Sequence, residues 1–279
     1  MQLDLFPHMQ KTFPASGDML DFMSSKSHIE WTEFTWNPAT GCTKISPGCK
    51  YCYAETMAER LQAMGAPGYE NGFKITLHSD RLTQPMQRKK SAIYFVNSMS
   101  DMFHEEIPFD FLDRMFDTIR KTPQHIYQIL TKRPKRMEEY FQTRTAPDNA
   151  WLGVTVEDKK YGLPRIDILR RIDAKTRFLS IEPLLEDLGQ FDLSGIHWVI
   201  VGGESGAKAR PMKAEWVEHI KKQCQTAGVP FFFKQWGMWG EDGVRRPKSA
   251  NGRLLKGKKY DGVPNLEAAN AKESQLALI

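Results

Sequence analysis

Short apolar runs recur along most of this chain, and most of them are followed by a stretch with helical periodicity. Seven runs are rich in Ile, Val, Phe and Trp and are therefore predicted to form strands. They cover residues 30–36, 92–97, 125–130, 151–156, 177–181, 197–201 and 229–233. Several runs are apolar throughout rather than alternating, which is typical of strands in a parallel sheet covered on both faces.

Helical patterns lie between the strands. Residues 111–121 and 213–227 each place apolar side chains on one stripe, and Gly228 is a typical stop for the second stretch. A further helix is predicted to begin near Tyr53. Repeated strand–helix units favour right-handed crossovers and a parallel sheet. The predicted fold class is therefore α/β, a full or partial parallel (β/α) barrel.

The same pattern divides the chain into three segments. Residues 1–26 show no periodicity, which predicts a flexible N-terminal arm. Residues 27–239 form the predicted barrel. After Trp239 the apolar content falls and Lys and Gly become frequent, so residues 240–279 are predicted to be a C-terminal appendage without a core of its own.

Composition adds little to this picture. Of the 279 residues, 41% are hydrophobic and 26% are charged, as is usual for a soluble globular protein. The net charge of +5 is compatible with a nucleic-acid partner but also with many metabolic enzymes. The chain shows neither a secretory signal nor an apolar run of membrane-spanning length, so a cytoplasmic protein is expected.

Three of the four cysteines lie within eleven residues. Cys42, Cys49 and Cys52 have the spacing C-x6-C-x2-C, directly after the first predicted strand. In a reducing cytosol such a group is more typical of a metal site than of a disulfide framework. Three thiolates can bind three irons of a cubane cluster and leave the fourth iron open to another ligand. Cys224 lies on an apolar helical stripe and is predicted to be a buried structural thiol.

Zinc is the competing interpretation of the three cysteines. Three cysteines and a histidine form a common structural zinc site, and His78 or His104 would supply the fourth ligand. Because neither histidine has the spacing of a zinc finger, spacing alone leaves the cluster and the zinc ion as open alternatives.

Polar clusters follow six of the predicted strands. In a parallel α/β barrel the carboxyl ends of all strands face one rim, where catalytic groups gather. The clusters are residues 97–101, 131–134, 155–158, 180–183, 202–206 and 234–237. Taken singly, each cluster is also explained as a turn or a helix cap.

The cysteine segment resembles that of the radical S-adenosylmethionine (SAM) superfamily. The usual signature of that superfamily is C-x3-C-x2-C, with an aromatic residue just before the last cysteine. Here Cys49 and Cys52 match the last pair and Tyr51 is the aromatic residue. The gap between Cys42 and Cys49 is six residues instead of three.

A second resemblance, to a phage and prophage family with three cysteines and no assigned reaction, covers residues 28–264. It is carried by the cysteine segment and by residues 29–38, 98–103, 130–134, 180–184, 202–206, 231–237 and 252–255. The resemblances imply a [4Fe–4S] cluster and SAM as cofactors. They also imply a 5′-deoxyadenosyl radical that takes a hydrogen atom from the substrate, and a reductase or flavodoxin-type electron donor.

Site roles follow from these resemblances and from the rim. Cofactor-binding roles are expected for Tyr51, Ser98, Ser100, Asp101, Gly202, Gly203 and Glu204. The alternative for residues 98–101 is a helix cap, and the two glycines are equally explained by a tight turn. Catalytic roles, as substrate ligands or proton carriers, are expected for Lys132, Glu182 and Glu204.

The expected substrate is a nucleobase, a nucleotide or a nucleic acid, with modification of phage DNA as one case. Three basic side chains would place positive charge at the rim, which suits an anionic substrate: Lys132, Arg133 and Lys234. Three tryptophans would either stack on a base or pack the rim: Trp36, Trp236 and Trp239.

Two further interpretations are open. One is a non-catalytic zinc protein whose basic rim binds nucleic acid. The other is a metal-independent barrel hydrolase or nuclease that would use the carboxylates of Asp101, Glu157, Asp158, Glu182 and Glu204. No spacing in the sequence specifically supports the hydrolytic chemistry.

Overall fold

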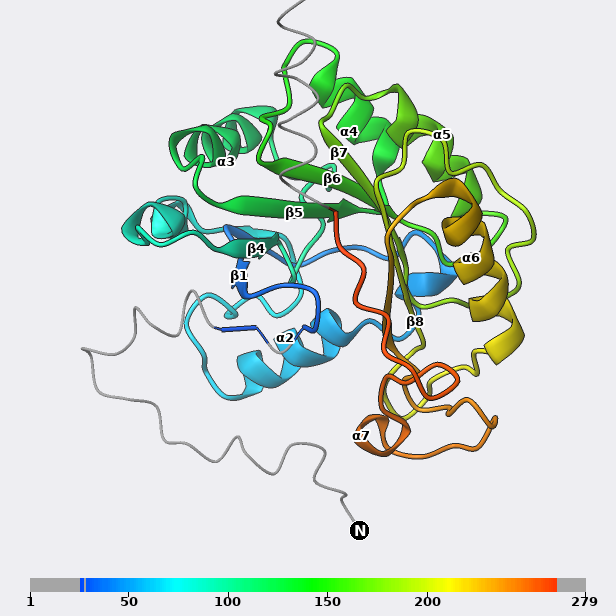
Figure 1. Ribbon diagram of the computed structural model, residues 1–279. Coiled ribbons are helices and arrows are strands. Elements are labelled where there is room, and N and C mark those ends of the chain that lie inside the picture. Colours follow the sequence, from blue (N-terminus) through cyan, green and yellow to red (C-terminus); the bar gives the residue numbers. More distant parts are fainter. Residues whose placement is uncertain (1–25, 28, 265–279) are drawn as a thin grey trace, which may run out of the picture.

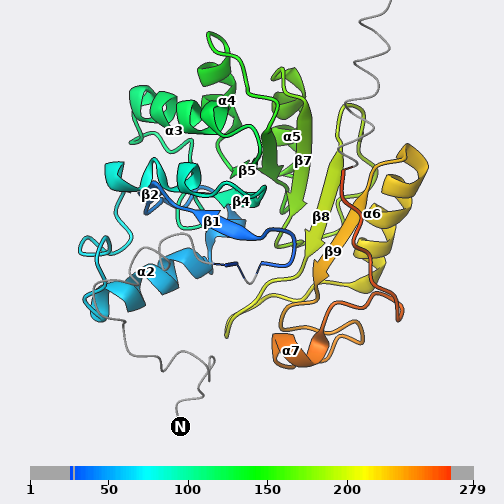
Figure 2. The ribbon, with the colours of Figure 1, turned by 60° about the vertical axis from the view of Figure 1, so that its left-hand side comes forward.

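A computed structural model describes residues 26–27 and 29–264 of the chain (Figure 1). Its centre is a seven-stranded sheet, in which every neighbouring pair is parallel and the strands follow one another in chain order. The strands are β1 (Phe34–Trp36), β4 (Ile93–Val96), β5 (Ile126–Thr131), β6 (Ala150–Thr155), β7 (Thr176–Ile181), β8 (Trp198–Gly202) and β9 (Phe231–Gln235). The sheet curls from β1 to β9 (Figure 2), and these two strands form its edges. The predicted α/β parallel barrel is confirmed in its partial form.

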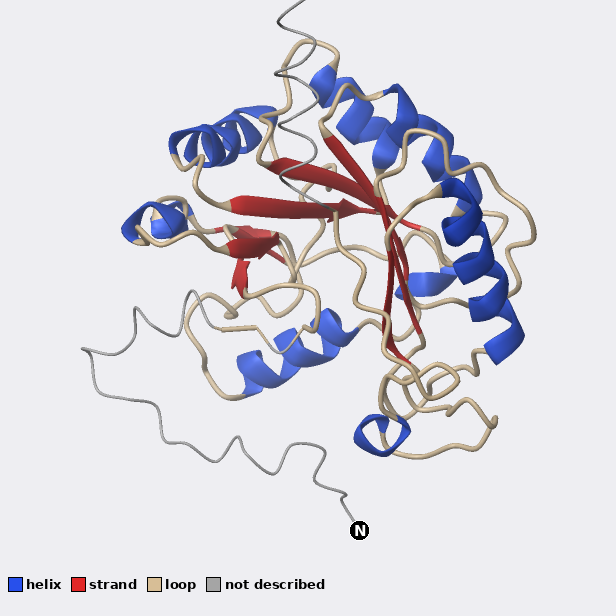
Figure 3. Cartoon of the chain, viewed as in Figure 1, coloured by secondary structure: helices blue, strands red, loops and turns tan. Residues whose placement is uncertain are grey.

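Helices cover the convex face of the sheet (Figure 3). They are α3 (Phe109–Lys121), α4 (Pro134–Phe141), α5 (Leu163–Arg171) and α6 (Ala214–Ala227). The chain also forms α2 (Tyr53–Ala63) and α7 (Lys248–Asn251), which lie outside this layer, and 3-10 turns at Pro47–Cys49, Ser79–Arg81 and Gln84–Gln87. A separate antiparallel pair consists of β2 (Ala39–Thr40) and β3 (Thr76–Leu77). Within the described part of the chain, every helix is too short or too polar to span a bilayer.

Most predicted elements are confirmed to within two residues. The stripe predicted for residues 111–121 is buried in α3, and the stretch 213–227 forms α6, which ends at Gly228 with φ of +66°. Cys224 is fully buried in α6, as predicted.

The first strand is shorter than predicted, because the chain turns at residues 29–32 before β1 begins. The backbone N–H of Thr32 donates to the carbonyl of Ile29 at 3.2 Å. The turn places the Trp31 ring against Phe95 and Trp198 on the concave face of the sheet, with centroid distances of 4.8 and 6.2 Å. The apolar run therefore continues past the strand because it also supplies a core side chain.

Two apolar clusters lie on the two faces of the sheet. The larger one fills the space between the convex face and helices α3 to α6. The smaller one lies on the concave face and consists of Trp31, Phe95, Trp151, Phe178, Trp198, Ile200 and Phe232. Because side chains alternate along a strand, both faces of these strands are covered, which explains their continuous apolar runs.

Residues 252–262 run along the free edge of β9. The N–H of Phe233 donates to the carbonyl of Tyr260 at 2.9 Å, and the N–H of Gly262 donates to the carbonyl of Phe231 at 3.0 Å. Leu255 is fully buried in the larger core. This segment occupies the edge that a closed barrel would pair with β1, so the barrel stays open.

Parts of the predicted terminal segments lie outside the described residues. Of the predicted N-terminal arm, only Lys26 is described, and it forms an antiparallel bridge with Phe34. Residues 265–279 of the predicted C-terminal appendage also lie outside the described part.

Candidate functional site

The cysteine loop, residues 42–52, extends from the end of β2 to the start of α2. Cys42, Cys49 and Cys52 are all free thiols, and each is partly buried. The N–H of Cys42 donates to the carbonyl of Phe73 at 3.2 Å, which fixes the entry of the loop. Three sulfur donors therefore lie on one loop beside the carboxyl ends of the strands.

Gly41 determines how the chain enters this loop. Its φ is +88°, and a Cβ atom there would lie 2.2 Å from the carbonyl oxygen of Lys74. Its N–H donates to the carbonyl of Met99 at 3.0 Å. A left-handed backbone this close to another backbone segment requires glycine. Cys42 thus follows a position where any side chain would shift the loop.

Replacing Gly41 with alanine is expected to displace Cys42 and to lower the free energy of unfolding by about 2 kcal/mol or more, because backbone strain and a steric clash combine. Gly65→Ala is the matched control, since Gly65 has φ of +66° but no atom within 4 Å of the Cβ position. Urea denaturation and iron content after reconstitution are measured for both variants. Equal losses in both would show that the contact with Lys74 is unimportant.

Arg133, just before α4, extends to the cysteine loop. Its Nη1 lies 3.6 Å from Cys42 Sγ, and its Nη2 donates to the carbonyl (3.2 Å) and hydroxyl (2.7 Å) of Thr43. Its Nε donates to Glu105 at 2.8 Å, and its Nη1 lies 3.5 Å from Asp101. The Arg133 side chain is only 4% exposed. The prediction that Arg133 presents its charge to a substrate is therefore wrong, because its contacts direct the guanidinium toward the loop.

The surroundings of Cys42 disfavour a free thiolate. Burial and the negative charge of Asp101 raise the pKa of the Cys42 thiol to about 11, although Arg133 acts in the opposite direction. Metal binding would therefore release the proton of this thiol. A second sulfur also has a polar neighbour, since the hydroxyl of Ser46 lies 3.7 Å from Cys49 Sγ.

Glu157, just after β6, supports the middle of the cysteine loop. It is fully buried and pairs with Arg165 at 2.5 Å. A Cβ atom at Gly48 would lie 3.1 Å from the Glu157 side chain, so the loop packs on this pair. Burial by itself raises the pKa of Glu157, but hydrogen bonds from Arg165 and the charges of Arg165 and Lys132 outweigh it and lower the pKa. Glu157 is thus an ionised structural group.

Glu204 and Arg210 connect the loop after β8 to the cysteine loop. Glu204 accepts hydrogen bonds from Arg210 Nη2 (2.6 Å), Nε (2.9 Å) and backbone N–H (2.8 Å). Arg210 Nη2 also donates to the carbonyl of Pro47 at 3.0 Å, and its guanidinium lies 5.3 Å from the ring centroid of Tyr51. Both carboxylate oxygens of Glu204 are therefore engaged in positioning Arg210.

Asp101 ties the ends of β4 and β5 together. It accepts hydrogen bonds from the N–H of Phe103 (3.0 Å), the hydroxyl of Thr131 (2.6 Å) and the N–H of Lys132 (2.9 Å). The side chain is buried. The role predicted for Asp101 in cofactor binding stays a prediction. One of its three contacts lies within the local turn, and the other two join it to the end of β5.

A polar layer lies on the concave side of the rim. Lys234 Nζ is 3.0 Å from Glu182, and these side chains are 18% and 14% exposed. Ser180 donates to the other oxygen of Glu182 at 3.2 Å. Lys132 Nζ donates to the hydroxyl of Thr155 at 3.3 Å. Side chains that follow or end β5, β6, β7 and β9 thus meet at the carboxyl rim, as predicted for parallel strands.

Two glycines after β8 allow close packing beside this layer. A Cβ atom at Gly202 would lie 2.5 Å from the carboxylate of Glu182, and one at Gly203 would lie 2.0 Å from the carbonyl of Trp236. The contact with the backbone of Trp236 therefore requires glycine at position 203, whereas the contact at Gly202 is with the end of the Glu182 side chain. Their proposed contact with SAM stays a prediction.

Ser98 and Ser100 lie beside the cysteine loop after β4. The hydroxyl of Ser98 donates to Asn37 Oδ1 at 3.2 Å, and that of Ser100 donates to the carbonyl of Ala39 at 3.1 Å. Both serines are partly exposed. They connect the end of β4 to the segment that leads into the loop.

The five carboxylates considered for a hydrolase have different surroundings. The carboxylates of Asp101, Glu157 and Glu204 accept hydrogen bonds from other groups of the protein. Asp158 accepts hydrogen bonds from the N–H groups of residues 161 and 162 at 2.6 and 3.2 Å. Glu182 is partly exposed and is held by side chains of the concave face. Among these five, Glu182 is therefore the best placed to meet a substrate.

Two of the three tryptophans pack the interior. Trp36 and Trp236 are buried, and each indole N–H donates to a backbone carbonyl, at 2.8 and 2.7 Å. Stacking on a base is thus wrong for these two residues, and the packing alternative is confirmed. Trp239 is partly exposed and donates to a carbonyl at 2.8 Å.

The histidines considered as zinc ligands have protein partners. His78 Nε2 is 2.9 Å from the hydroxyl of Thr40. His104 Nδ1 accepts from the N–H of Glu106 at 3.1 Å, so its Nε2 carries the proton and donates to Thr43 at 2.8 Å. In the described residues, no three His, Cys, Asp or Glu side chains are arranged around a single metal ion.

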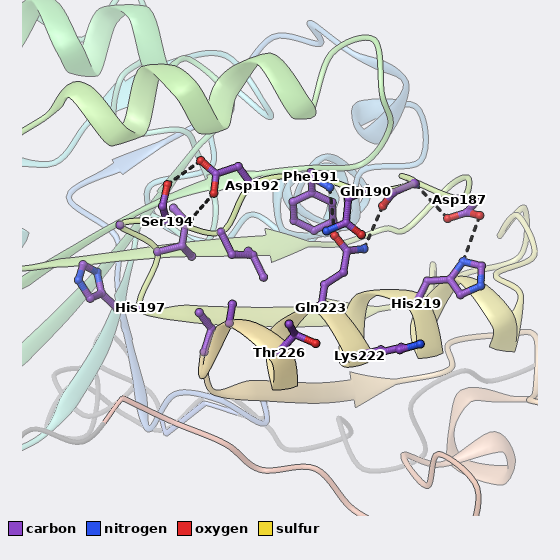
Figure 4. A pocket seen from close by; sticks show the side chains of 16 residues that line it. Asp187, Gln190, Phe191, Asp192, Ser194, His197, His219, Lys222, Gln223 and Thr226 are labelled. Carbon is purple, nitrogen blue, oxygen red and sulfur yellow. Dashed lines mark hydrogen bonds and ion pairs between the residues drawn. The ribbon is translucent and has the colours of Figure 1, made fainter.

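A cleft of about 970 Å³ lies between residues 187–197 and α6 (Figure 4). The connection from β7 to β8 contains no helix, which leaves this space. His219 is 3.2 Å from Asp187, and Gln223 accepts from the N–H of Phe191 at 3.0 Å. None of the lining residues belongs to the cysteine loop or to the rim clusters, so the cleft is separate from the candidate site.

Sequence patterns do not single out every residue that holds the cysteine loop. Arg210 is absent from the expected site residues, although its charge is opposite to that of Glu204 six positions earlier. Arg165 lies on a helix with no motif of its own. Both are identified only by their contacts.

Comparisons with known proteins give distant similarities. Three solved structures of spore photoproduct lyase mutants resemble this chain. They have 15, 11 and 14% identity and TM-scores of 0.45, 0.46 and 0.46, and the alignments cover 64, 76 and 72% of this chain and 58, 79 and 63% of those chains. The third is described with bound AdoMet and dinucleoside spore photoproduct. This chain thus spans less than two thirds of the length of two of them. Among curated proteins, none matches the sequence.

A protein-family model also matches most of the chain. It is described as a protein of unknown function (DUF5131) and matches residues 26–264. This range contains the cysteine loop, all seven strands of the sheet and the segment that covers the edge of β9. The chain therefore belongs to the DUF5131 family of proteins of unknown function.

Proposed function

We propose that this protein is a radical SAM enzyme that acts on a nucleobase, a nucleotide or a nucleic acid. The proposal is carried by three free, partly buried thiols on one loop at the carboxyl rim of a partial parallel barrel. Cys42, Cys49 and Cys52 would ligate three irons of a [4Fe–4S] cluster. When bound, the cluster and SAM supply the radical that takes a hydrogen atom from the substrate.

The donor set supports a cluster over a structural zinc ion. A structural zinc ion fills its coordination shell with four protein ligands. His104 uses both ring nitrogens in hydrogen bonds, and His78 is bonded to Thr40. Three thiols without a ready fourth ligand suit a site that leaves one position open for SAM.

Some rim residues are proposed to contact SAM directly, and others are proposed to position their neighbours. Residues proposed to contact SAM are Tyr51, Ser98, Ser100, Gly202 and Gly203. Asp101 and Glu204 would act through their neighbours, because their carboxylates already accept several hydrogen bonds from the protein. These two residues would keep the strand ends and Arg210 in place while the cofactors bind.

Glu182, Lys234 and Lys132 would bind the substrate. The paired carboxylate and ammonium of Glu182 and Lys234 offer an acceptor and donors side by side, which suits the edge of a nucleobase. They lie directly above the aromatic cluster of the concave face, since Lys234 Nζ is 5.9 Å from the ring centroid of Trp31. Glu182 is also the proposed proton carrier.

The excess of basic over acidic residues in one segment supports a nucleic-acid substrate, such as phage DNA. Residues 240–264 contain three acidic residues against a larger basic set: Arg245, Arg246, Lys248, Arg253, Lys256, Lys258 and Lys259. This segment lies beside the loop after β8, where Arg245 Nη2 donates to the carbonyl of Ala207 at 2.7 Å. Positive charge at this position would attract phosphate groups.

The test is anaerobic reconstitution with iron and sulfide, reduction, and chromatographic detection of 5′-deoxyadenosine formed from SAM. We expect formation by the wild-type protein and stimulation by DNA oligonucleotides. Glu182→Gln is expected to keep the cluster but to lose the stimulated rate by about 10²-fold or more. Glu215→Gln, an exposed carboxylate on α6, is the control. A colourless protein with stoichiometric zinc would contradict the proposal.

A further inference from the structure

We infer that Arg133 is a positioning residue for the cysteine loop and that it raises the reduction potential of the cluster proposed for this loop. The part that concerns the potential rests on the proposed function. The part that concerns the loop rests on contacts that exist without any cluster.

Arg133 holds two consecutive residues of the loop with one side chain. Nη1 contacts Cys42 Sγ, while Nη2 donates to both the carbonyl and the hydroxyl of Thr43. A guanidinium presents its donors in a rigid planar fork, so these contacts can form together. The ammonium of a lysine has no such fork and cannot reproduce the set.

The backbone of Arg133 is itself well fixed. Its N–H donates to the hydroxyl of Thr131 at 2.8 Å, and Thr131 in turn donates to Asp101. Pro134 begins α4 directly afterwards. With Nε bonded to Glu105, the guanidinium is held from the end of β5 and has little freedom to leave the loop. A fixed donor beside Cys42 Sγ would orient this ligand before a cluster binds.

The charge of Arg133 would also act on the cluster. Hydrogen bonds to the sulfur ligands and nearby charges set the potential of an iron–sulfur cluster. A guanidinium stays protonated, and at 4% exposure its charge is poorly screened. Reduction adds negative charge, so a positive neighbour favours the reduced state. Arg133 also pairs with Asp101, whose carboxylate would otherwise act on Cys42 without compensation.

The first measurement is a redox titration of the reconstituted protein, followed by electron paramagnetic resonance. Arg133→Met is expected to lower the midpoint potential by about 59 mV or more, which is a tenfold change in a one-electron equilibrium. Arg133→Lys keeps the positive charge, so its midpoint potential is expected to stay closer to that of the wild type than the midpoint potential of Arg133→Met. A fully loaded Arg133→Met protein with the wild-type potential would overturn the electrostatic part.

Arg136→Met is the matched control. Arg136 lies three residues after Arg133, in the first turn of α4, but its guanidinium donates to the carbonyl of Ile107 at 2.8 Å and stacks on Phe109. Within the described part of the chain, the Arg136 side chain does not contact the cysteine loop. The control is expected to keep the wild-type potential, and a shift equal to that of Arg133→Met would overturn the assignment to Arg133.

The second measurement uses hydrogen exchange of the cluster-free protein. Amides of residues 42–50 are expected to exchange faster in Arg133→Met and in Arg133→Lys, because neither side chain can form the fork. Arg136→Met is expected to leave exchange unchanged. Wild-type exchange in Arg133→Met would overturn the positioning role. If the wild-type protein takes up no cluster, the proposed function fails, while this measurement still decides whether Arg133 holds the loop.

Discussion

Replacing Cys49 with alanine is expected to abolish assembly of the [4Fe–4S] cluster, because only two of its three protein ligands remain. Cys49 is a partly buried residue of the cysteine loop and belongs to none of the apolar cores. The barrel is therefore expected to stay folded, with an unchanged midpoint of urea denaturation. Iron content and visible absorbance of the anaerobically reconstituted protein measure the loss.

Cys224→Ala is the matched control for this substitution. Cys224 is fully buried on α6, away from the rim, so the loss of its sulfur is expected to cost about 1 kcal/mol or more of stability. Its iron content is expected to equal that of the wild type. Full iron content in Cys49→Ala, or equal loss in both variants, would show that the cysteine loop does not hold the cluster.

Replacing Glu157 with alanine is expected to lower the free energy of unfolding by about 3–5 kcal/mol, because Arg165 would be left as an uncompensated buried charge. The Arg165 side chain is 7% exposed and also donates to the carbonyl of Thr155 at 2.7 Å. Gly48 packs on Glu157, so the cysteine loop should also loosen. Urea denaturation measures the first effect, and hydrogen exchange of residues 42–50 measures the second.

Glu138→Ala provides the comparison for an exposed pair. Glu138 pairs with Arg171 at 2.6 Å, and the Arg171 side chain is 57% exposed. Surface pairs contribute little to stability, so the denaturation midpoint is expected to change only slightly. A comparable loss in both variants would mean that burial of the Glu157 pair does not determine its contribution.

Much of the fold is predictable because its signals are local. Each strand is a short apolar run, and helix α6 ends at Gly228 because glycine readily adopts the left-handed conformation found there. The first strand is shorter than predicted because Trp31 lies in the turn before it, where its ring packs into the concave core. An apolar run does not distinguish a strand from a turn that buries one large side chain.

The site is predictable in part. The three cysteines are close in sequence, so their placement on one loop follows from chain connectivity. The meeting of Glu182 with Lys234 follows from the parallel topology, which brings the strand ends to one rim. The direction in which the Arg133 guanidinium points follows neither from chain connectivity nor from the parallel topology, since it depends on which neighbour accepts its hydrogen bonds. Its contact with Cys42 spans 91 positions of sequence.

By itself the sequence determined the number and order of the strands in the main sheet, the parallel α/β fold and the grouping of three thiols, because periodicity and spacing act between near neighbours. It did not predict the separate pair of β2 and β3. The tertiary structure alone decided that the barrel stays open, since residues 252–262 occupy the edge of β9. It also decided that Arg133, Glu157 and Arg210 hold the cysteine loop. Such contacts join distant segments, and their partners are selected by burial and charge compensation in the folded chain.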